Sequence, residues 1–295
     1  MNKVLVIGGN KFAGKMFAAK CAKSGYLDVT VLNRSGTGPL GVKIVKGDRL
    51  RMDPDFYDSF EYIIDFCGYT VNDLKPLKGY LQNIGWRRGE TKNYVFISSG
   101  AVYKDSPQMM KSPYYTIGNK QVSSPIGGAL AFGEYGINKS ECERYLYGIG
   151  DNLLYIVRPP FILGDDDRVI RVRRIMESII KNEPIPVDGD GTLPFSVIWV
   201  DDYVDTLFSV IFEGVIPCNI INITSNECYS SVSLIQEIGR IIRNSDPKVI
   251  LGSSTFDFPN ESLLLLSDPR IDVTSFQPIK ARLEEFFKVH NYDLL

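Results

Sequence analysis

The sequence shows no excess of either charge, and it contains no long apolar run and no internal repeat. Its 295 residues include 33 Lys and Arg against 35 Asp and Glu, which gives a net charge of −2. This balance offers no electrostatic reason to expect binding to nucleic acid or to a membrane surface. No apolar stretch approaches the roughly 18 residues that a membrane span requires. The composition therefore argues against both classes of partner.

The cysteines are too scattered to form a paired motif. None lies in Cys-x-x-Cys spacing, and their number is odd (Cys21, Cys67, Cys142, Cys218 and Cys228). We therefore expect neither a zinc site nor a disulfide framework, which is typical of a reducing compartment. A strand-like pattern begins by residue 3 and leaves no room for a signal peptide, so we expect a cytoplasmic protein without a bound metal.

Apolar runs alternate with amphipathic segments through the first half of the chain. The strand-like runs cover residues 3–7, 28–34, 42–45, 62–66, 94–98 and 153–157, and helical segments lie near 14–24, 53–59, 71–84 and 134–149. Strands that are apolar throughout indicate a parallel sheet covered on both faces. The pattern predicts an α/β fold with a doubly wound parallel sheet (a Rossmann fold), which binds ligands at the carboxyl ends of its strands.

The second half of the chain has a mixed pattern. A basic helix is expected over 168–181, strands over 197–200 and 219–223, and helices near 231–243 and 279–290. We predict an NAD(P)-binding domain over 1–160 and a smaller C-terminal α/β substrate domain over 161–295, with 197–225 returning to the first sheet. The basic cluster is either a solvated helix face or an anion site (Arg168, Arg171, Arg173 and Arg174).

The stretch 104–133 is rich in Pro, Gly, Ser and Tyr and has no clear period. A long loop inside a compact domain is usually functional or mobile. We expect this one to fold over the substrate as a lid, with Tyr114 and Tyr115 as candidate contacts.

A glycine loop follows the first apolar run. Gly8, Gly9 and Gly14 lie between a strand and a helix, where free backbone N–H groups can bind a pyrophosphate. Three glycines at a helix start can also serve packing alone. We assign the loop to a cofactor (Gly8, Gly9, Asn10, Lys11, Phe12 and Gly14). Lys11 is unusual because it places a long cationic side chain in the middle of the loop.

The end of the second strand gives a second indication of the cofactor. An acidic residue here would bind the adenosine ribose hydroxyls of NAD, but the chain has Asn33 followed by Arg34. A neutral side chain beside an arginine accommodates a 2′-phosphate. Arg34 alone could be a surface residue of a turn. Together with Lys11 it favours NADP over NAD.

Tyr135 and Lys139 are four residues apart on an expected helix and so share one face. A lysine ammonium beside a phenol stabilises the phenolate, which makes the tyrosine a candidate general acid/base. A chain with this composition would contain about one Tyr-x-x-x-Lys by chance. Ser98 and Ser99, at the end of the strand 94–98, can supply the hydroxyl of such a site or can simply form a turn.

These residues, taken in order, resemble the extended short-chain dehydrogenase/reductases, and within them the NAD-dependent epimerase/dehydratase family. The resemblance rests on the glycine loop, SSGAVY (98–103), Tyr135/Lys139, RPPFILG (158–164) and VDDYVDTLF (200–208). A narrower likeness, carried by GGNKFAG, NRS (33–35), GDR (47–49) and DFCGY (65–69), is to a sub-branch that includes chloroplast stem-loop RNA-binding proteins.

The resemblance implies a role for each matching residue. Tyr135 is the catalytic acid/base, Lys139 lowers its pKa and holds the nicotinamide ribose, and Ser99 bonds the substrate oxygen. The remaining cofactor contacts are Asp48 near the adenine, the strand end Phe66, Cys67 and Gly68, then Ser98 and Pro159. For Cys67 a plain role as a small core residue is the preferred alternative. A homodimer is expected because relatives often form one.

The resemblance implies an NAD(P)-dependent oxidoreductase or epimerase that transfers hydride at a sugar-like or other carbinol or carbonyl substrate. Two departures narrow this. Phe195 stands where nucleotide-sugar members carry an arginine for the diphosphate, which disfavours such a sugar. Gly100 and Ala101 follow Ser99 where a dehydratase has an acid/base pair, so an epimerase or reductase is favoured. The alternative is a non-catalytic NADP-sensing or RNA-binding protein on the same fold.

Overall fold

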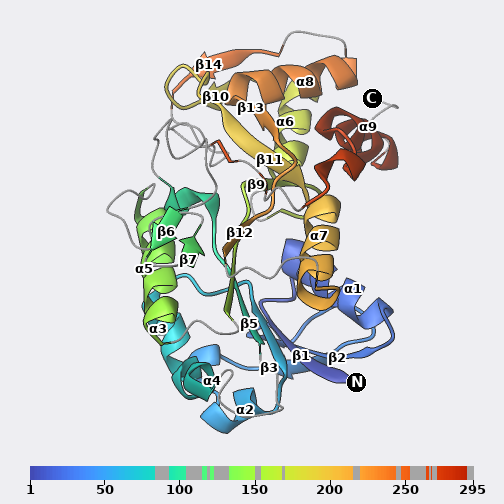
Figure 1. Ribbon diagram of the computed structural model, residues 1–295. Helices are drawn as coiled ribbons and strands as arrows, with labels where there is room; N and C mark the ends of the chain where they lie inside the picture. Colours follow the sequence, from blue (N-terminus) through green and yellow to red (C-terminus); the bar gives the residue numbers. More distant parts are fainter. Residues whose placement is uncertain are drawn as a thin grey trace.

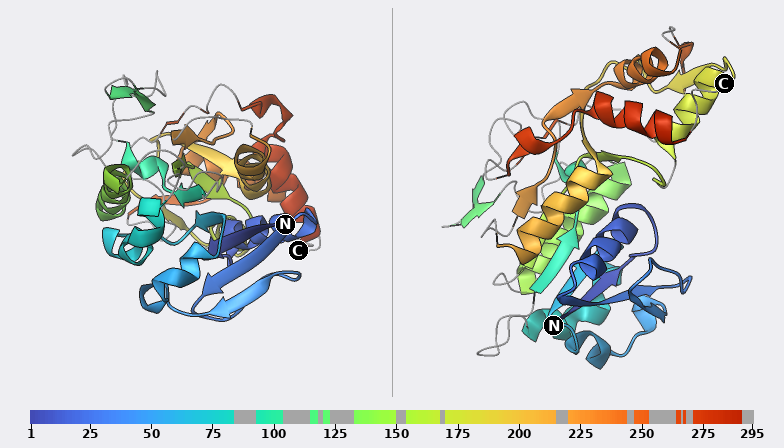
Figure 2. Two further views of the ribbon diagram at one scale, coloured as in Figure 1. Left: turned by 60° about the horizontal axis from the view of Figure 1, so that its bottom comes forward. Right: turned by 90° about the vertical axis from the view of Figure 1, so that its right-hand side faces the viewer.

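The computed structural model describes residues 1–83, 93–103, 115–117, 120–122, 133–149, 154–167, 170–214, 220–243, 247–252, 264–265, 267 and 271–290. It shows an elongated molecule (Figures 1 and 2). The N-terminal elements form one end around a large sheet, and α6 (Arg171–Ile180), α8 (Ser231–Arg243) and α9 (Ile279–Val289) lie at the other end. In the described part of the chain, no helix is long and apolar enough to cross a bilayer.

The large sheet has seven parallel strands in the order β12-β8-β5-β4-β1-β2-β3. Their bounds are β1 Asn2–Ile7, β2 Leu27–Asn33, β3 Lys43–Lys46, β4 Tyr62–Asp65, β5 Asn93–Ile97, β8 Leu154–Arg158 and β12 Ile220–Asn222. The chain order reverses beside β1, which is the position where doubly wound sheets bind ligands. The predicted doubly wound fold is confirmed.

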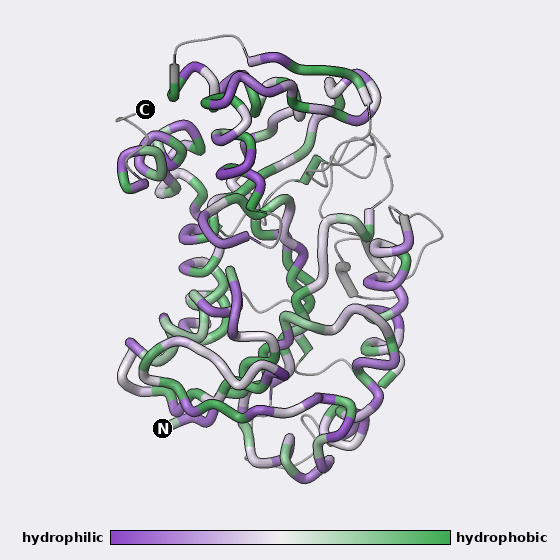
Figure 3. Tube along the Cα trace, turned by 180° about the vertical axis from the view of Figure 1, so that it is seen from behind, coloured by the Kyte–Doolittle hydropathy of each residue, from purple (hydrophilic) through white to green (hydrophobic). Residues whose placement is uncertain are grey.

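Helices cover both faces of this sheet, as the apolar strands require. Val4 and Val6 of β1 pack in one core with Phe17 and other residues of α1 (Phe12–Lys23) and α7 (Val200–Phe212). Leu5 and Ile7 alternate to the opposite face. There they join a second core with α3 (Val71–Leu74), α4 (Lys78–Asn83) and α5 (Gly133–Ile149). Figure 3 shows the apolar character of the central strands.

Short elements complete the first half of the chain. They are α2 (Pro54–Asp58) and the 3-10 turns η1 (Arg49–Arg51), η2 (Lys75–Leu77) and η3 (Gly100–Val102). Asp48 begins η1 and Ser99 begins η3, because each side chain accepts a hydrogen bond from a backbone N–H two residues on. Both predicted site residues therefore have a turn-forming role.

The C-terminal half adds two small sheets. β9 (Phe161–Leu163), β11 (Phe195–Trp199) and β13 (Glu227–Tyr229) form one in the order β13-β11-β9, and β10 (Ile185–Val187) pairs with β14 (Val249–Leu251). The 3-10 turn η4 (Val273–Ser275) precedes α9. Within the segment 197–225, β12 lies in the large sheet beside β8, whereas β11 lies in the three-stranded sheet. The division into two domains near residue 160 stays a prediction.

The stretch 104–133 contributes the antiparallel pair β6 (Tyr115–Ile117) and β7 (Lys120–Val122) and the first residue of α5. Tyr114 and Arg168 lie outside the described residues. The lid over the substrate stays a prediction.

Candidate functional site

The glycine loop is pressed against the end of β4. Gly8 has a φ of +87°, and a Cβ atom there would lie 2.2 Å from Cys67 Sγ. A Cβ atom on Gly14 would lie 2.6 Å from the Gly8 carbonyl oxygen. Only glycine satisfies both the left-handed backbone and the lack of space at residue 8. Lys11 precedes α1 without a side-chain cap, so backbone N–H groups at the helix start are left for a ligand.

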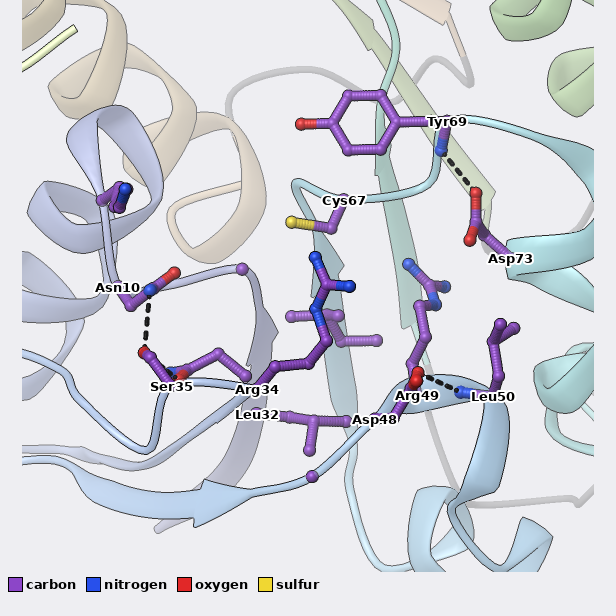
Figure 4. A pocket seen from close by; sticks show the side chains of 15 residues that line it. Asn10, Leu32, Arg34, Ser35, Asp48, Arg49, Leu50, Cys67, Tyr69 and Asp73 are labelled. Atoms are coloured by element: carbon purple, nitrogen blue, oxygen red, sulfur yellow. Dashed lines mark hydrogen bonds between the residues drawn. The ribbon is translucent and has the colours of Figure 1, made fainter. Parts of the chain in front are cut away.

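A pocket of about 740 Å³ opens beside this loop, at the ends of β1, β2, β3 and β4 (Figure 4). Among the predicted cofactor residues, its walls contain Gly8, Asn10, Lys11, Asn33, Arg34, Asp48 and Cys67. The other predicted residues lie outside its walls (Gly9, Phe12, Gly14, Phe66, Gly68, Ser98, Tyr135, Lys139 and Pro159). The pocket is therefore the adenosine end of the predicted site.

Asn33 shapes the turn that carries Arg34. Its buried Oδ1 accepts from Ser35 Oγ at 2.7 Å and from Gly36 N at 2.8 Å, and its Nδ2 donates to the Thr37 carbonyl at 2.7 Å. Asn10 Nδ2 donates to Ser35 Oγ at 3.1 Å and so links the glycine loop to this turn. The asparagine is thus a local structural residue, as Asx turns commonly are.

Lys11 and Arg34 both line the pocket with exposed side chains. Neither forms an ion pair with any described residue. Figure 4 shows Arg34 directed toward the side of the pocket where Cys67 and Tyr69 lie. Two cations that have no counter-charge within the described segments can bind an anionic ligand group.

Arg49 is a pocket residue that the sequence reasoning missed. It is buried, and its Nη1 and Nη2 donate to the two carboxylate oxygens of Asp65 at 2.8 and 2.6 Å. Burial opposes ionisation of Asp65, but the Arg49 charge outweighs it and the pKa of the carboxyl is lowered. The sequence contains one indication of this pair. Asp65 is a single carboxylate near the end of the otherwise apolar run 62–66, and a buried carboxylate needs a cationic partner.

Cys67 lies between the glycine loop and this ion pair. Burial, followed by the Asp65 charge, raises the pKa of its thiol to about 11. The thiol is therefore neutral at physiological pH, and it serves here as a small wall residue of the pocket.

Tyr135 and Lys139 lie near one another on α5, with Lys139 Nζ 5.9 Å from the centre of the Tyr135 ring. Lys139 is buried and donates to the carbonyl oxygens of Gly68 and Ile97, at 2.7 Å each. Burial lowers its pKa to about 8, against the opposing effects of Asp65, Cys142, Cys67 and Glu143. Tyr135 is 48% exposed. The lysine is thus anchored at the ends of β4 and β5, and the tyrosine is about half exposed.

Ser98 and Ser99 face different partners. Ser99 Oγ accepts from Ala101 N at 3.1 Å, which leaves its hydroxyl hydrogen available to donate. Ser98 Oγ donates to the buried carboxylate of Glu143, which also pairs with the buried Arg158. Ser98 is therefore engaged with α5 and β8, and its assignment to the cofactor stays a prediction.

The Glu143–Arg158 ion pair is part of a buried network of polar side chains next to the site. Tyr103 places its ring 4.9 Å from Arg158 Cζ and donates its hydroxyl to Asn222 Oδ1 at 2.8 Å. Pro159 accepts from Gly100 N at 2.8 Å. The network joins the ends of β5, β8 and β12 to α5. Glu143 follows Lys139 by four residues, which is the sequence signal that could have revealed it.

Two arginines of the predicted anion site and Phe195 have contacts that the sequence did not reveal. Phe195 is fully buried in β11, with its ring centre 5.0 Å from that of Phe161. Arg171 pairs with Asp167 at 3.3 Å, and Arg173 pairs with Asp165 at 2.8 Å. These arginines are therefore already paired with carboxylates.

No protein-family model matches the chain, and no curated protein matches it. Several solved structures do. One is a dTDP-glucose 4,6-dehydratase from Bacillus anthracis in complex with NAD (14% identity, 99% of this chain and 98% of that chain covered, TM-score 0.73). Another is a UDP-glucose 4-epimerase from Thermotoga maritima with UDP-glucose (16%, 99% and 100%, TM-score 0.72). A third is a UDP-glucuronic acid 4-epimerase from Bacillus cereus with UDP-glucuronic acid and NAD (16%, 99% and 98%, TM-score 0.71). At these identities the likenesses establish the fold of this chain over nearly its whole length.

Proposed function

We propose that the protein binds a nicotinamide dinucleotide and transfers hydride at a carbinol or carbonyl substrate, with Tyr135 as the acid/base. One observation carries this proposal. Lys139, and Tyr135 beside it, lie at the carboxyl ends of the parallel strands, where the glycine loop and its pocket also lie. Two of the three similar structures described above contain NAD, which supports a nicotinamide cofactor here.

The residues fit such a cofactor. Gly8 and Gly14 leave room where a Cβ atom would otherwise lie within 3 Å of a neighbour, so a pyrophosphate could approach the backbone. Lys11 and Arg34 would hold an adenosine 2′-phosphate, and Asp48 would lie near the adenine. The arrangement favours NADP over NAD, because both cations lie at the adenosine end.

Side chains of the protein would transfer the proton that accompanies hydride transfer. The cofactor, when bound, accepts or donates a hydride. The Lys139 ammonium favours the phenolate form of Tyr135, which then takes the proton of a carbinol or, once protonated, returns it to a carbonyl oxygen. Ser99 would donate its hydroxyl hydrogen to the same substrate oxygen.

We favour an epimerase or a reductase. Gly100 and Ala101 begin η3 directly after Ser99 and provide no acid/base pair for dehydration. The buried Phe195 offers nothing to a diphosphate, so the substrate we propose is a sugar derivative or another carbonyl compound without that group. A homodimer is also part of this proposal and rests on the resemblance alone.

Cofactor binding is tested by titrating NADPH and NADH against the purified protein. We expect tighter binding of NADPH, and an Arg34→Ala variant that loses about 10- to 100-fold in NADPH affinity with little change for NADH. The matched control is Arg51→Ala, because Arg51 is exposed on the neighbouring turn and lies outside the pocket walls. Tighter NADH binding contradicts the NADP preference, and failure of both cofactors to bind contradicts the enzyme proposal.

Turnover is tested with a panel of carbonyl compounds and sugar derivatives. Loss of NADPH absorbance marks a reductase, whereas a product isomer without net cofactor change marks an epimerase. Tyr135→Phe should lower the rate about 10²- to 10⁴-fold and leave NADPH affinity nearly unchanged. NADP binding without any turnover would favour a non-catalytic sensor, and a salt-sensitive RNA complex near physiological ionic strength would favour RNA binding.

A further inference from the structure

Asp65 is a fully buried carboxylate that lies between the two ends of the candidate site. It accepts hydrogen bonds from both terminal nitrogens of Arg49, from the Tyr94 hydroxyl at 2.6 Å and from Cys67 N at 2.9 Å. Arg49 lines the adenosine pocket, and its buried Nε has no hydrogen-bond partner in the part of the chain that the structure describes. The carboxylate therefore has a contact to the adenosine end through Arg49.

Asp65 also reaches the catalytic end through the turn after β4. It holds Cys67 N, and a Cβ atom on Gly68 would lie 3.2 Å from Asp65 Oδ2 and 2.7 Å from Phe96 Cε2. The Gly68 carbonyl then accepts from Lys139 Nζ at 2.7 Å. A continuous path of close contacts thus runs from Asp65 through Cys67 and Gly68 to Lys139.

The titratable groups that act on Lys139 can be named for the described residues. Its own helix presents Cys142 and Glu143, the strand end presents Cys67 and Asp65, and the rings of Tyr69 and Tyr135 lie 5.2 and 5.9 Å from Nζ. Glu143 is held by Arg158. Among these groups Asp65 has the largest effect in favour of the ammonium form.

The charge of Asp65 determines whether Lys139 can stay protonated in this buried environment. Asp65 is paired with Arg49 and also acts on the buried Lys139. Glu143, the other buried carboxylate that acts on Lys139, is already paired with Arg158. If the charge of Asp65 is removed, Arg49 and Lys139 share a dry environment, and arginine does not give up its proton in proteins. Lys139 is then the group that must become neutral.

We infer that Asp65 is the positioning residue of the site: it holds the 65–69 turn against Lys139 and places a buried negative charge near that side chain. Its relevance to catalysis rests on the proposed function. Its structural part does not depend on any ligand, so the two can fail separately.

The first test measures the free energy of unfolding in urea between about pH 4 and pH 11, without cofactor. Because the pKa of Lys139 is lowered to about 8, the unfolded chain binds more protons between that pH and the ordinary lysine pKa, and stability rises with pH across this window. The rise should be absent in Lys139→Met. Subtracting the two curves gives the midpoint at which Lys139 loses its proton in the folded protein.

Two variants should move this midpoint in opposite directions. Asp65→Asn should lower it by about 1 to 3 pH units, because an opposite charge is lost. Arg49→Met should raise it, because the competing cation is lost while Asp65 remains. The control is Tyr94→Phe, which removes one hydrogen bond to the same carboxylate without changing its charge. If Asp65→Asn does not fold, the direction of the Arg49→Met change still decides.

The second test repeats the series with NADPH affinity as the readout. We expect affinity to fall above about pH 8 in the wild type and at lower pH in Asp65→Asn. Midpoints that stay in place in both charge variants, or that move in the same direction, would overturn the role of Asp65. Midpoints that move as expected in a protein that binds no NADPH would support that role and refute the cofactor proposal alone.

Discussion

Replacing Gly8 with alanine should destabilise the protein by a predictable amount with two separable parts. The left-handed backbone at φ +87° costs a residue with a Cβ atom about 1–2 kcal/mol. The new methyl group would lie 2.2 Å from Cys67 Sγ, and such overpacking adds about 1–3 kcal/mol. We therefore expect Gly8→Ala to lower the free energy of unfolding by about 2–5 kcal/mol.

A substitution at Gly25 serves as a control that measures the backbone cost without the overpacking cost. It has a φ of +77°, and a Cβ atom there would have no described atom within 4 Å apart from its chain neighbours. Gly25→Ala should therefore cost only the backbone part, about 1–2 kcal/mol. The second control is Gly8→Ala combined with Cys67→Ala. Removing the sulfur leaves Cys67 Cβ, at 3.3 Å, as the nearest neighbour, so most of the overpacking cost should disappear.

Urea unfolding of these three variants and the wild type measures these differences as changes in midpoint at constant slope. Equal losses for Gly8→Ala and Gly25→Ala, together with no recovery from Cys67→Ala, would refute the close contact between the loop and β4. NADPH titration of Gly8→Ala adds a functional readout, because displacement of the loop should weaken cofactor binding more than Gly25→Ala does.

Three further substitutions test separate features of the molecule. Lys11→Gly should reduce NADPH affinity about tenfold and NADH affinity much less, whereas equal losses in the titration would mean that Lys11 binds the pyrophosphate common to both or only shapes the loop. Glu143→Gln should lower stability by about 3–5 kcal/mol because it leaves the buried Arg158 without its counter-charge, and adding Arg158→Met should recover part of the loss in the same urea assay. Tyr203→Phe should leave stability unchanged or raise it by about 1–3 kcal/mol, because the buried Tyr203 hydroxyl has no hydrogen-bond partner among the described residues. The matched Tyr80→Phe should instead lose about 0.5–1.5 kcal/mol, since Tyr80 donates to the Asn93 carbonyl at 3.3 Å, and a destabilised Tyr203→Phe would contradict this account.

The strands and long helices could be predicted from the sequence because their signals are local. Each central strand of a parallel sheet is apolar on both faces, so the run 62–66 corresponds to β4 at Tyr62–Asp65. The segment 231–243 was predicted as a helix and is α8. The position of the glycine loop could also be predicted from the sequence, because a left-handed backbone and a close contact both require glycine.

The buried charges could not be predicted in the same way. The sequence reasoning assigned Asp48 to the cofactor and passed over its neighbour Arg49, which lines the pocket and pairs with Asp65. These partners come from separate strand ends, and nothing in the local pattern of either links them. Ser98 shows the converse. The resemblance assigns it to the cofactor, which stays a prediction, and only the structure shows that its hydroxyl donates to Glu143.

The sequence by itself determined the alternation of strands and helices, the position of the glycine loop and the spacing of Tyr135 and Lys139, because backbone preference and apolar periodicity act over a few residues. Only the tertiary structure decided which charges meet. Folding brings the carboxyl ends of the parallel strands together and excludes water there. Each buried charge there must therefore pair with a residue that is distant in the sequence. In this protein that requirement places Asp65 between Arg49 and Lys139.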